Sequence, residues 1–213
     1  MTVLILHQHF NTPAKGGAIR SYYLATALAA KGVRVTVITA HNENTYRRET
    51  VENVDVHYLP IAYNNRFGFF ARSQSFIKYV TGAVKLARQF QDADYCYAIS
   101  VPLTVGFAAM WIKMRYKIPY LFEVGDLWPE APVQLGFINN FVFAQSLYAL
   151  EKRIYKSANA VVVLSPDIKS AIEKKVPGKT VHLIPNMADC DFYNPELKDS
   201  SLENRYGVAG KLV

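Results

Sequence analysis

Short apolar runs alternate along the chain with longer segments of helical periodicity. The first run, Val3–Leu6, contains no polar residue, which is typical of a strand that is buried on both faces. A helical pattern follows over Ala18–Ala30 and ends at Gly32, and Val33–Ile38 has the pattern of the next strand. The opening of the chain therefore predicts a strand–helix–strand unit.

The same alternation continues as far as residue 184. We predict further strands at 54–59, 95–99, 120–124, 160–164 and 181–184, and further helices at 69–90, 103–116, 141–156 and 167–175. Alternating strands and helices indicate an α/β fold. We expect a Rossmann-like, doubly wound parallel sheet of about seven strands, with right-handed crossovers and helices on both faces.

The last thirty residues have a different character. The chain turns polar after Pro185, a short helix is expected at 202–206, and 207–213 has the pattern of a turn that enters a new strand. A strand that begins there has no partner to pair with. We therefore expect residues 1–213 to form one N-terminal domain, with 207–213 as the start of a C-terminal domain that is absent.

Composition places the chain among globular proteins. It has 213 residues, of which 51% are hydrophobic and 19% charged, which excludes a disordered chain. Lys and Arg number 24 against 17 Asp and Glu, a formal charge of +7. Such a balance favours an anionic partner, such as phosphate, a nucleotide or an acidic membrane surface, without choosing among them.

Cysteine usage and the N-terminus favour a cytoplasmic location. The two cysteines, Cys96 and Cys190, are too few for a disulfide framework, and Cys96 is expected in the core. The first six residues lack the basic region of a signal peptide. Two stretches without formal charge, 95–112 and 131–150, contain too many polar residues for membrane spans.

The loops that follow the strands are the places where parallel α/β sheets bind ligands. The first loop contains Gly16 and Gly17 and leads into the helix that carries Arg20. Paired glycines let the backbone approach a ligand, and the free N–H groups of a helix start favour an anion. We expect Gly16, Gly17 and Arg20 to bind substrate, although a plain turn explains the glycines equally well.

Two further loops offer weaker candidates. Ser100 follows the strand at 95–99 and is positioned to bind a sugar hydroxyl, although a turn or helix-cap serine is the more common case. Ser165 is expected simply to start a helix. His7 and His9 alternate at a strand end without a visible third ligand, so no metal site is expected.

The loop after the strand at 120–124 carries the strongest candidates. Glu123, Asp126 and Glu130 place three carboxylates within eight residues, beside the ring of Trp128. Carboxylates suit sugar hydroxyls as a general base or as orienting acceptors, and a Trp face suits the C–H surface of a sugar ring. The alternative is a helix N-cap Asp126 with ordinary surface glutamates, but the position at a strand end favours function.

These segments, in this order, carry a resemblance to a known family. The residues concerned are Gly16-Gly17 with Arg20, 28–39, Glu123-Val124-Gly125-Asp126-Leu127-Trp128-Pro129-Glu130, 163–166, and 184–186 with Asp189 and Phe192. On them the chain resembles the N-terminal domain of family 4 glycosyltransferases of the GT-B fold. The segment 123–130 looks like the E-x-R-D-x-W-P segment of a bacterial surface-polysaccharide branch that includes WbuB-type aminosugar transferases.

The chain departs from that branch at two places. Gly125 stands where the branch usually has Arg, and the loop at 100–102 lacks the His that many family members carry. The role usually given to that His is therefore not assigned to a residue at this position. Asp126, or else Glu123, is our candidate by position.

The resemblance implies a retaining glycosyltransferase. It implies transfer of a sugar from a nucleotide diphosphate donor to a lipid-linked saccharide in capsule or O-antigen biosynthesis, with no metal and no cofactor. This half would hold the acceptor, and Gly16–Gly17 would meet the donor phosphates and stabilise the leaving diphosphate. The absent half would bind most of the donor, so the chain alone is expected to be inactive.

A basic stretch without carboxylates favours a membrane partner. From 56 to 91 there is no Asp or Glu, and basic residues are interleaved with aromatic ones: Arg66, Arg72, Lys78, Lys85 and Arg88 with Phe67, Phe69, Phe70, Phe76 and Tyr79. Such a stretch can rest on an anionic bilayer at the inner face of the cell membrane. An ordinary surface helix is the alternative, and no nucleic-acid motif accompanies the charge.

Two other classes of protein remain to be weighed. A nicotinamide-dependent oxidoreductase fits poorly, because no G-x-G-x-x-G follows the first strand and the second strand ends in Thr39-Ala40-His41 rather than in an acidic residue. A non-catalytic sugar- or lipid-binding module stays open.

Overall fold

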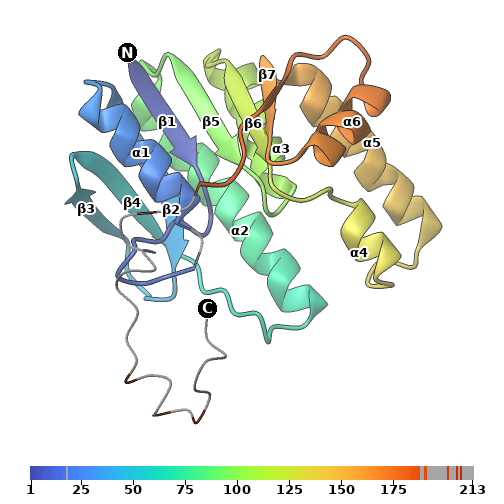
Figure 1. The fold of residues 1–213 in the computed structure, drawn as a ribbon, viewed down its shortest axis with the longest axis horizontal. Helices are drawn as coiled ribbons and strands as arrows, with labels where there is room; N and C mark the ends of the chain where they lie inside the picture. The colour runs from blue at the N-terminus through green and yellow to red at the C-terminus, as the bar shows by residue number, and fades with distance from the viewer. Residues whose placement is uncertain (18, 188–189, 191–200, 202–204, 206, 208–213) are drawn as a thin grey trace.

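The chain forms an α/β fold built on one eight-stranded sheet (Figure 1). A computed structural model describes residues 1–213 except 18, 188–189, 191–200, 202–204, 206 and 208–213. The strands are β1 (Thr2–Leu6), β2 (Arg34–His41), β3 (Arg47–Val51), β4 (Val54–Pro60), β5 (Tyr95–Ile99), β6 (Tyr120–Val124), β7 (Ala160–Val163) and β8 (Val181–Leu183). Their order is β3-β4-β2-β1-β5-β6-β7-β8, and all neighbours are parallel except the antiparallel β3 and β4.

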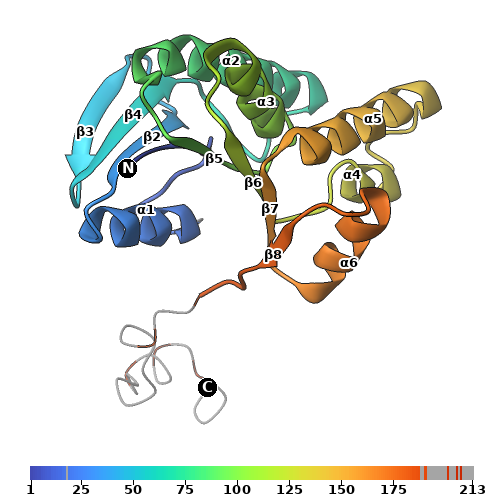
Figure 2. The same cartoon turned by 90° about the horizontal axis from the view of Figure 1, so that it is seen from above.

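Helices cover both faces of this sheet, which confirms the predicted Rossmann-like architecture. They are α1 (Arg20–Ala30), α2 (Phe69–Ala87), α3 (Thr104–Tyr116), α4 (Glu130–Gln134), α5 (Phe141–Ser157) and α6 (Pro166–Lys175), with a 3-10 turn η1 (Arg88–Phe90) after α2. Figure 2 shows α1 on one side of the sheet and α2, α3 and α5 on the other. The helices predicted before residue 184 are all present, and α4 is an additional short one.

Two hydrophobic clusters pack against the sheet, one on each face. The larger includes Leu4 and Leu6 of β1 and buried side chains of α2, α3, α5 and α6. The smaller includes Val3 and Ile5 of β1 and packs against α1. Because both faces of β1 are covered, its successive side chains from Val3 to Leu6 are all apolar and do not alternate between apolar and polar. Cys96 is fully buried in the larger cluster, as expected.

The strand β3 is absent from the sequence-based prediction, because its sequence is polar. Arg47–Val51 alternates between partly buried and exposed positions, as an edge strand does when one face meets solvent. It pairs with β4 through a tight turn in which Glu52 and Asn53 have φ of 48° and 64°. The exposed ion pair of Arg48 with Asp55, at 2.8 Å, bridges the two strands. Charged side chains of this kind protect a sheet edge from further pairing.

The two stretches without formal charge fold as ordinary elements of the α/β architecture. Residues 95–112 form β5 and most of α3, and 131–150 form most of α4 and the first half of α5. Within the described residues, no helix combines the length and apolar character that crossing a bilayer requires. Asp189, Phe192, most of the helix expected at 202–206 and the strand expected near 211–213 lie outside the described residues.

Candidate functional site

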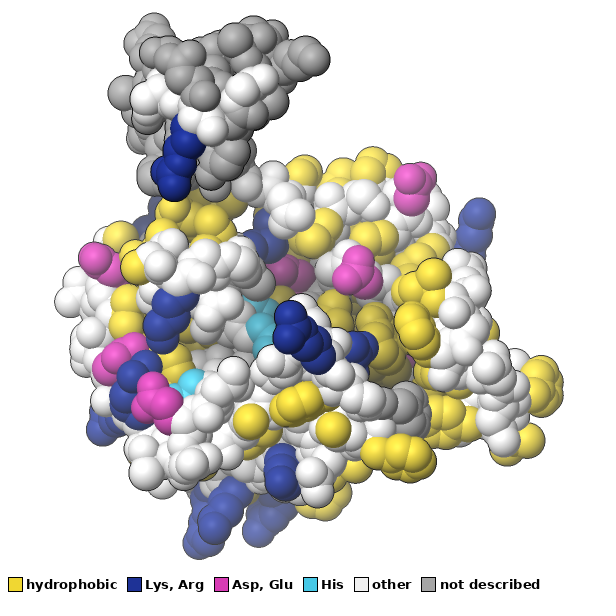
Figure 3. All heavy atoms as spheres, turned by 90° about the horizontal axis from the view of Figure 1, so that it is seen from below, with side chains coloured by type: hydrophobic (Ala, Val, Ile, Leu, Met, Phe, Trp, Pro, Cys, Tyr) yellow, Lys and Arg dark blue, Asp and Glu magenta, His cyan; other side chains and the backbone are white. Residues whose placement is uncertain are grey.

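The carboxyl ends of β1, β5, β6 and β7 meet at one edge of the sheet, the lower edge in Figure 1 and the face turned to the viewer in Figure 3. All the loops that the sequence singled out leave the sheet here. Parallel pairing brings them together, because adjacent parallel strands end side by side. We describe the residues of this edge from its centre outward.

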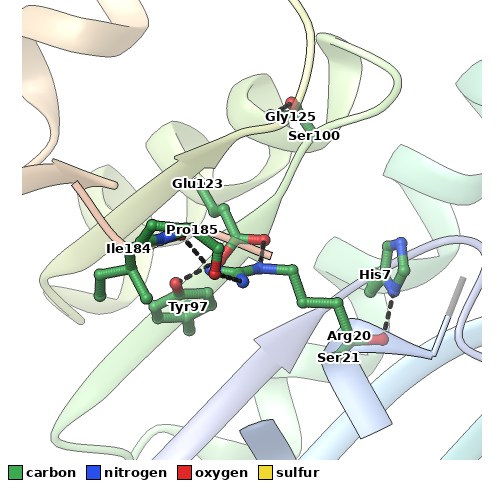
Figure 4. A network of polar contacts seen from close by, with 9 residues as sticks. All are labelled: His7, Arg20, Ser21, Tyr97, Ser100, Glu123, Gly125, Ile184 and Pro185. Atoms are coloured by element: carbon green, nitrogen blue, oxygen red, sulfur yellow. Dashed lines mark hydrogen bonds and ion pairs between the residues drawn. The ribbon is translucent and has the colours of Figure 1, made fainter. Parts of the chain in front are cut away.

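A buried ion pair occupies the centre of the edge (Figure 4). Arg20, at the start of α1, donates from Nε to Glu123 Oε1 at 3.0 Å and from Nη2 to Oε2 at 3.2 Å. The hydroxyl of Tyr97, in β5, donates to the same Oε2 at 2.6 Å. Glu123 is only 1% exposed, so its charge depends on these donors for compensation.

Arg20 also holds the segment that follows β8. Its Nη1 donates to the carbonyl of Pro185 at 2.7 Å, and its Nη2 donates to the carbonyl of Ile184 at 3.0 Å. The guanidinium thus joins α1, β6 and the chain beyond β8. Beside it lies an open cavity of about 590 Å³, lined by Arg20, Tyr23, Leu24, Thr26, Ala27, Ala30, Glu52, Asn53, Tyr97, Ile184, Pro185 and Met187.

Tyr97 is the residue of this network that sequence reasoning missed. Burial, with the Glu123 carboxylate beside it, raises the pKa of its hydroxyl, so the hydroxyl stays protonated and remains a donor. Strand alternation in the sequence puts Tyr97 and Ile99 on one face of the sheet. The structure adds that Ile99 is the register partner of Glu123, which brings Tyr97 to the same face as this carboxylate. The sequence pattern alone gives no sign of that contact.

Both glycines of the loop before α1 have a left-handed backbone conformation. Gly16 and Gly17 have φ of 68° and 83°, in the region that side chains disfavour. A Cβ on Gly17 would lie 3.2 Å from Nδ2 of Asn11, so space is tight as well. Among the described residues no side chain caps the start of α1 at Ile19, so no side chain competes with a ligand for its first N–H groups.

His7 lies beneath this loop as a neutral residue. It is buried, and its Nδ1 is 2.7 Å from the hydroxyl of Ser21 in α1. Burial, with some help from His9, lowers the pKa of His7 to about 3, so the ring carries no charge near neutral pH. The described residues contain no group of three or more His, Cys, Asp or Glu side chains arranged to hold a metal ion.

Ser100 joins the ends of β5 and β6. Its hydroxyl accepts a hydrogen bond from the N–H of Gly125 at 3.2 Å, and its own N–H donates to the carbonyl of Glu123 at 2.9 Å. Ser100 is not a helix cap, because the N-cap of α3 is Leu103. A Cβ on Gly125 would meet its neighbours only at 3.8 Å, which is ordinary van der Waals contact, so a side chain can begin here without a clash.

The three carboxylates of the 123–130 segment do not converge. Glu123 is buried in the pair with Arg20, whereas Asp126 is exposed in the loop. The helix-cap interpretation of Asp126 is wrong, because the N-cap of α4 is Pro129 and no side chain caps it. Trp128 is partly buried against the larger cluster. The catalytic and substrate-binding roles of these residues stay predictions.

Glu130 belongs to a separate network that ties α4, α5 and α6 together. Lys175 Nζ donates to Glu130 Oε2 at 2.9 Å and to Glu151 Oε1 at 2.8 Å. Tyr155 donates to the same Glu151 oxygen at 2.9 Å. Glu151 is 1% exposed. Glu130 thus has a structural partner in Lys175. The buried Glu151 carboxyl also predicts that the stability of the fold depends on pH when Lys175 is replaced.

We expect Lys175→Met to destabilise the fold by about 2–3 kcal/mol at neutral pH, because it strips the buried Glu151 of its cation. Burial already raises the pKa of Glu151, against the opposing hydrogen bonds from Lys175 and Tyr155. Losing the cation raises that pKa further. A carboxyl whose pKa is raised in the folded state binds more protons when the protein is folded than when it is unfolded. The free energy of unfolding therefore falls as the pH rises above the ordinary pKa of a glutamate. The loss should therefore shrink between pH 7 and pH 5.

Urea unfolding of the variant at pH 5, 6 and 7 checks this expectation. Lys169→Met is the matched control, because Lys169 lies on the same helix in an exposed pair with Glu173 at 3.8 Å. The control should cost under about 0.5 kcal/mol at every pH. A loss for Lys175→Met that is independent of pH would contradict the buried-charge explanation.

The fold and this edge are those of a Rossmann-like domain of the kind found in GT-B glycosyltransferases. The family model described as "Glycosyl transferase 4-like domain" matches residues 15–187. The chain belongs to this family, which confirms the resemblance at that level but does not extend to the WbuB-type branch. Among curated protein sequences, none matches the chain.

Solved structures share the fold at low sequence identity. Sucrose-phosphate synthase from Thermosynechococcus elongatus has a TM-score of 0.70 at 16% identity, over 97% of this chain and 52% of that one. Anabaena HepE in complex with UDP-glucose has 0.59 at 14%, over 99% and 50%. Arabidopsis thaliana UGT89C1 complexed with UDP has 0.55 at 10%, over 96% and 55%. The chain thus spans about half the length of these proteins.

Proposed function

We propose that this chain is the acceptor-side half of a retaining glycosyltransferase that uses a nucleotide diphosphate sugar. The observation that carries the proposal is the uncapped start of α1 behind Gly16 and Gly17, at the ligand-binding edge of a glycosyl transferase 4-like domain. HepE with UDP-glucose and UGT89C1 with UDP, which share the fold, support a nucleotide-linked donor. The acceptor we propose is a lipid-linked saccharide of surface-polysaccharide synthesis.

Each part of the edge then has a distinct role. The Gly16–Gly17 loop and the first N–H groups of α1 stabilise the negative charge that develops on the leaving diphosphate. Asp126 orients or deprotonates the acceptor hydroxyl. Arg20, whose donors are directed at Glu123 and two carbonyls, acts as a positioning residue that holds α1 and its loop at this edge. No cofactor takes part, because the donor itself supplies the leaving group.

With a lipid-linked acceptor, we expect the protein to act at the cytoplasmic face of the membrane. The structure of α2 limits which part of this helix can contact lipid. Tyr79, Ala83 and Ala87 are fully buried, so the body of the helix is an ordinary amphipathic helix with its apolar face in the core. The basic residues Arg66, just before the helix, and Lys78, in its middle, remain exposed, and the first half of α2 with the segment before it is the part we assign to anionic lipid.

The test of the function uses a longer protein that includes the downstream half. It is screened with nucleotide-sugars against a lipid-linked acceptor. We expect Gly17→Ala to lower kcat/KM by at least about tenfold, because a Cβ strains the loop and displaces its N–H groups. Gly178→Ala is the matched control, since Gly178 also has a positive φ of 80° but has open space around it. Equal kinetics for both variants would contradict a phosphate-binding loop.

We further expect this chain alone to bind UDP-sugars weakly or not at all. Most donor contacts are assigned to the other half, so the 213-residue chain supplies only part of the site. Isothermal calorimetry with UDP-glucose measures this directly. Micromolar affinity would contradict the assignment of the chain to the acceptor side.

A further inference from the structure

A compact apolar surface projects from the molecule between α4 and α5. Five large side chains within nine residues are 43–76% exposed: Leu135, Phe137, Phe141, Val142 and Phe143. We call residues 135–143 the apolar tip. A hollow of about 380 Å³ lies between its aromatic rings. Single exposed apolar residues are common on protein surfaces, but a contiguous group of this kind marks an interaction site.

The apolar tip has a defined conformation of its own. The N–H groups of Phe137 and Ile138 donate to the carbonyl of Pro132 at 2.9 and 3.2 Å. Asn140 caps α5 by accepting a hydrogen bond from the N–H of Phe143 at 2.9 Å. Ile138 is buried and anchors the turn. The exposed rings therefore project from a braced turn whose shape is set before any partner binds.

The chemistry around the apolar tip matches a lipid surface. No charged residue occurs from 131 to 150, so no charge has to be desolvated when the tip meets lipid. The first half of α2 and the segment before it, here called the basic end of α2, add exposed Phe70 and Ile77 together with basic Arg66, Arg72 and Lys78, in a stretch without carboxylates. Apolar side chains with adjacent cations are the combination that binds anionic bilayers.

The fold places these two surfaces on the same side of the molecule. The N-terminal ends of α2 and α5 point to the same side of the molecule in Figure 1 and in Figure 2. In Figure 3, hydrophobic side chains gather over this side of the face that also carries the ends of the parallel strands. A flat membrane can therefore touch both surfaces at once and still lie next to the site edge.

We propose that the apolar tip inserts into the interfacial layer of an anionic bilayer, with the basic end of α2 as its electrostatic partner. The tip supplies a hydrophobic contribution that salt does not screen, and α2 supplies a contribution that it does. The proposal rests on the lipid-linked acceptor of the proposed function, because that acceptor would be held where the site edge faces the membrane. Binding to vesicles is measured without sugar transfer, so the two proposals fail separately.

Vesicle sedimentation with the 213-residue chain tests the proposal. Vesicles of phosphatidylglycerol and phosphatidylcholine are compared with pure phosphatidylcholine, at about 0.1 and 1 M salt, where the screening length falls from about 10 to 3 Å. The tip variant is Phe137→Ser with Phe141→Ser. The charge variant replaces Arg66, Arg72 and Lys78 with Gln. Met114→Ser on α3 is the matched control, because Met114 is also an exposed apolar side chain, 52% exposed, on another element.

We expect the tip variant to partition onto anionic vesicles at least tenfold more weakly, since each aromatic ring that leaves lipid is worth about tenfold or more. Its residual binding should vanish at high salt. The charge variant should lose binding mainly at low salt, and Met114→Ser should bind like the unmodified chain. Because the replaced rings are exposed, melting curves should coincide and exclude misfolding as the cause.

Phe141→Trp provides a second readout that is independent of affinity. The parent chain, which contains Trp111 and Trp128, gives the background emission. Insertion predicts that the emission added by the introduced indole is blue-shifted and is quenched by brominated lipid chains. Unchanged partitioning of the tip variant, or an introduced indole that stays unquenched in bound protein, would overturn the proposal. A dimer in ultracentrifugation that the tip variant abolishes, without vesicle binding by the parent chain, would overturn it in favour of a second copy as the partner.

Discussion

Replacing Asp126 with Asn, in the longer protein that contains the downstream half, is expected to lower kcat by about 100- to 10,000-fold, the range for losing a general base. The carboxylate is exposed directly after β6, at the edge where the fold gathers ligands. Asn keeps the size and the hydrogen-bonding oxygen of the side chain but cannot accept a proton at neutral pH. The loss should therefore appear in kcat more than in KM.

Stability measured on the same variant separates catalysis from structure. Asp126 caps no helix, because the N-cap of α4 is Pro129, so we expect the melting temperature to stay within about 2 °C of the parent. Asp92→Asn is the control, since Asp92 lies in an exposed pair with Arg34 away from this loop. Normal turnover with a lowered melting temperature would refute the catalytic role. Glu123 is the next candidate, although both of its oxygens already accept hydrogen bonds.

Replacing Arg20 with Met is expected to destabilise the domain by about 3–4 kcal/mol, because it leaves the Glu123 carboxylate buried without its cation. For a domain of this size that loss lowers the melting temperature by about 6–16 °C. The variant also removes the hydrogen bonds to the carbonyls of Ile184 and Pro185. Denaturant unfolding followed by circular dichroism measures the effect.

A double variant identifies the cause of that loss. Arg20→Met combined with Glu123→Gln removes the buried charge while an amide oxygen still accepts from Tyr97. We expect the double variant to be more stable than Arg20→Met alone, which is a coupling between sites in contact. Arg34→Met, which breaks the exposed pair with Asp92, should cost less than about 1 kcal/mol. Strict additivity of the two single losses would show that the buried charge is not responsible.

Elements with a strong local pattern were predictable from the sequence. Apolar runs such as Val161–Val163 specify strands because burial on both faces leaves no polar positions, and helical periodicity specifies the crossovers. Ser165 was predicted to start a helix, and it caps α6 by accepting from the N–H of Ile168 at 3.3 Å. β3 was not predicted, because an edge strand buries few of its side chains and its residue pattern therefore resembles that of a loop.

The candidate site also has some features that the sequence predicts and others that it does not. The sequence pattern shows which loops leave the carboxyl edge of the sheet, because each candidate loop directly follows a predicted strand. Glycine permits a positive φ without requiring it, so the left-handed conformation of Gly16 and Gly17 is seen only in the structure. The structure alone also shows that Glu123 pairs with Arg20, 103 positions away, whereas Glu130 pairs with Lys175. Two glutamates of one short segment look alike in sequence. Their environments differ because partners distant in the chain are selected by packing, which no local pattern encodes.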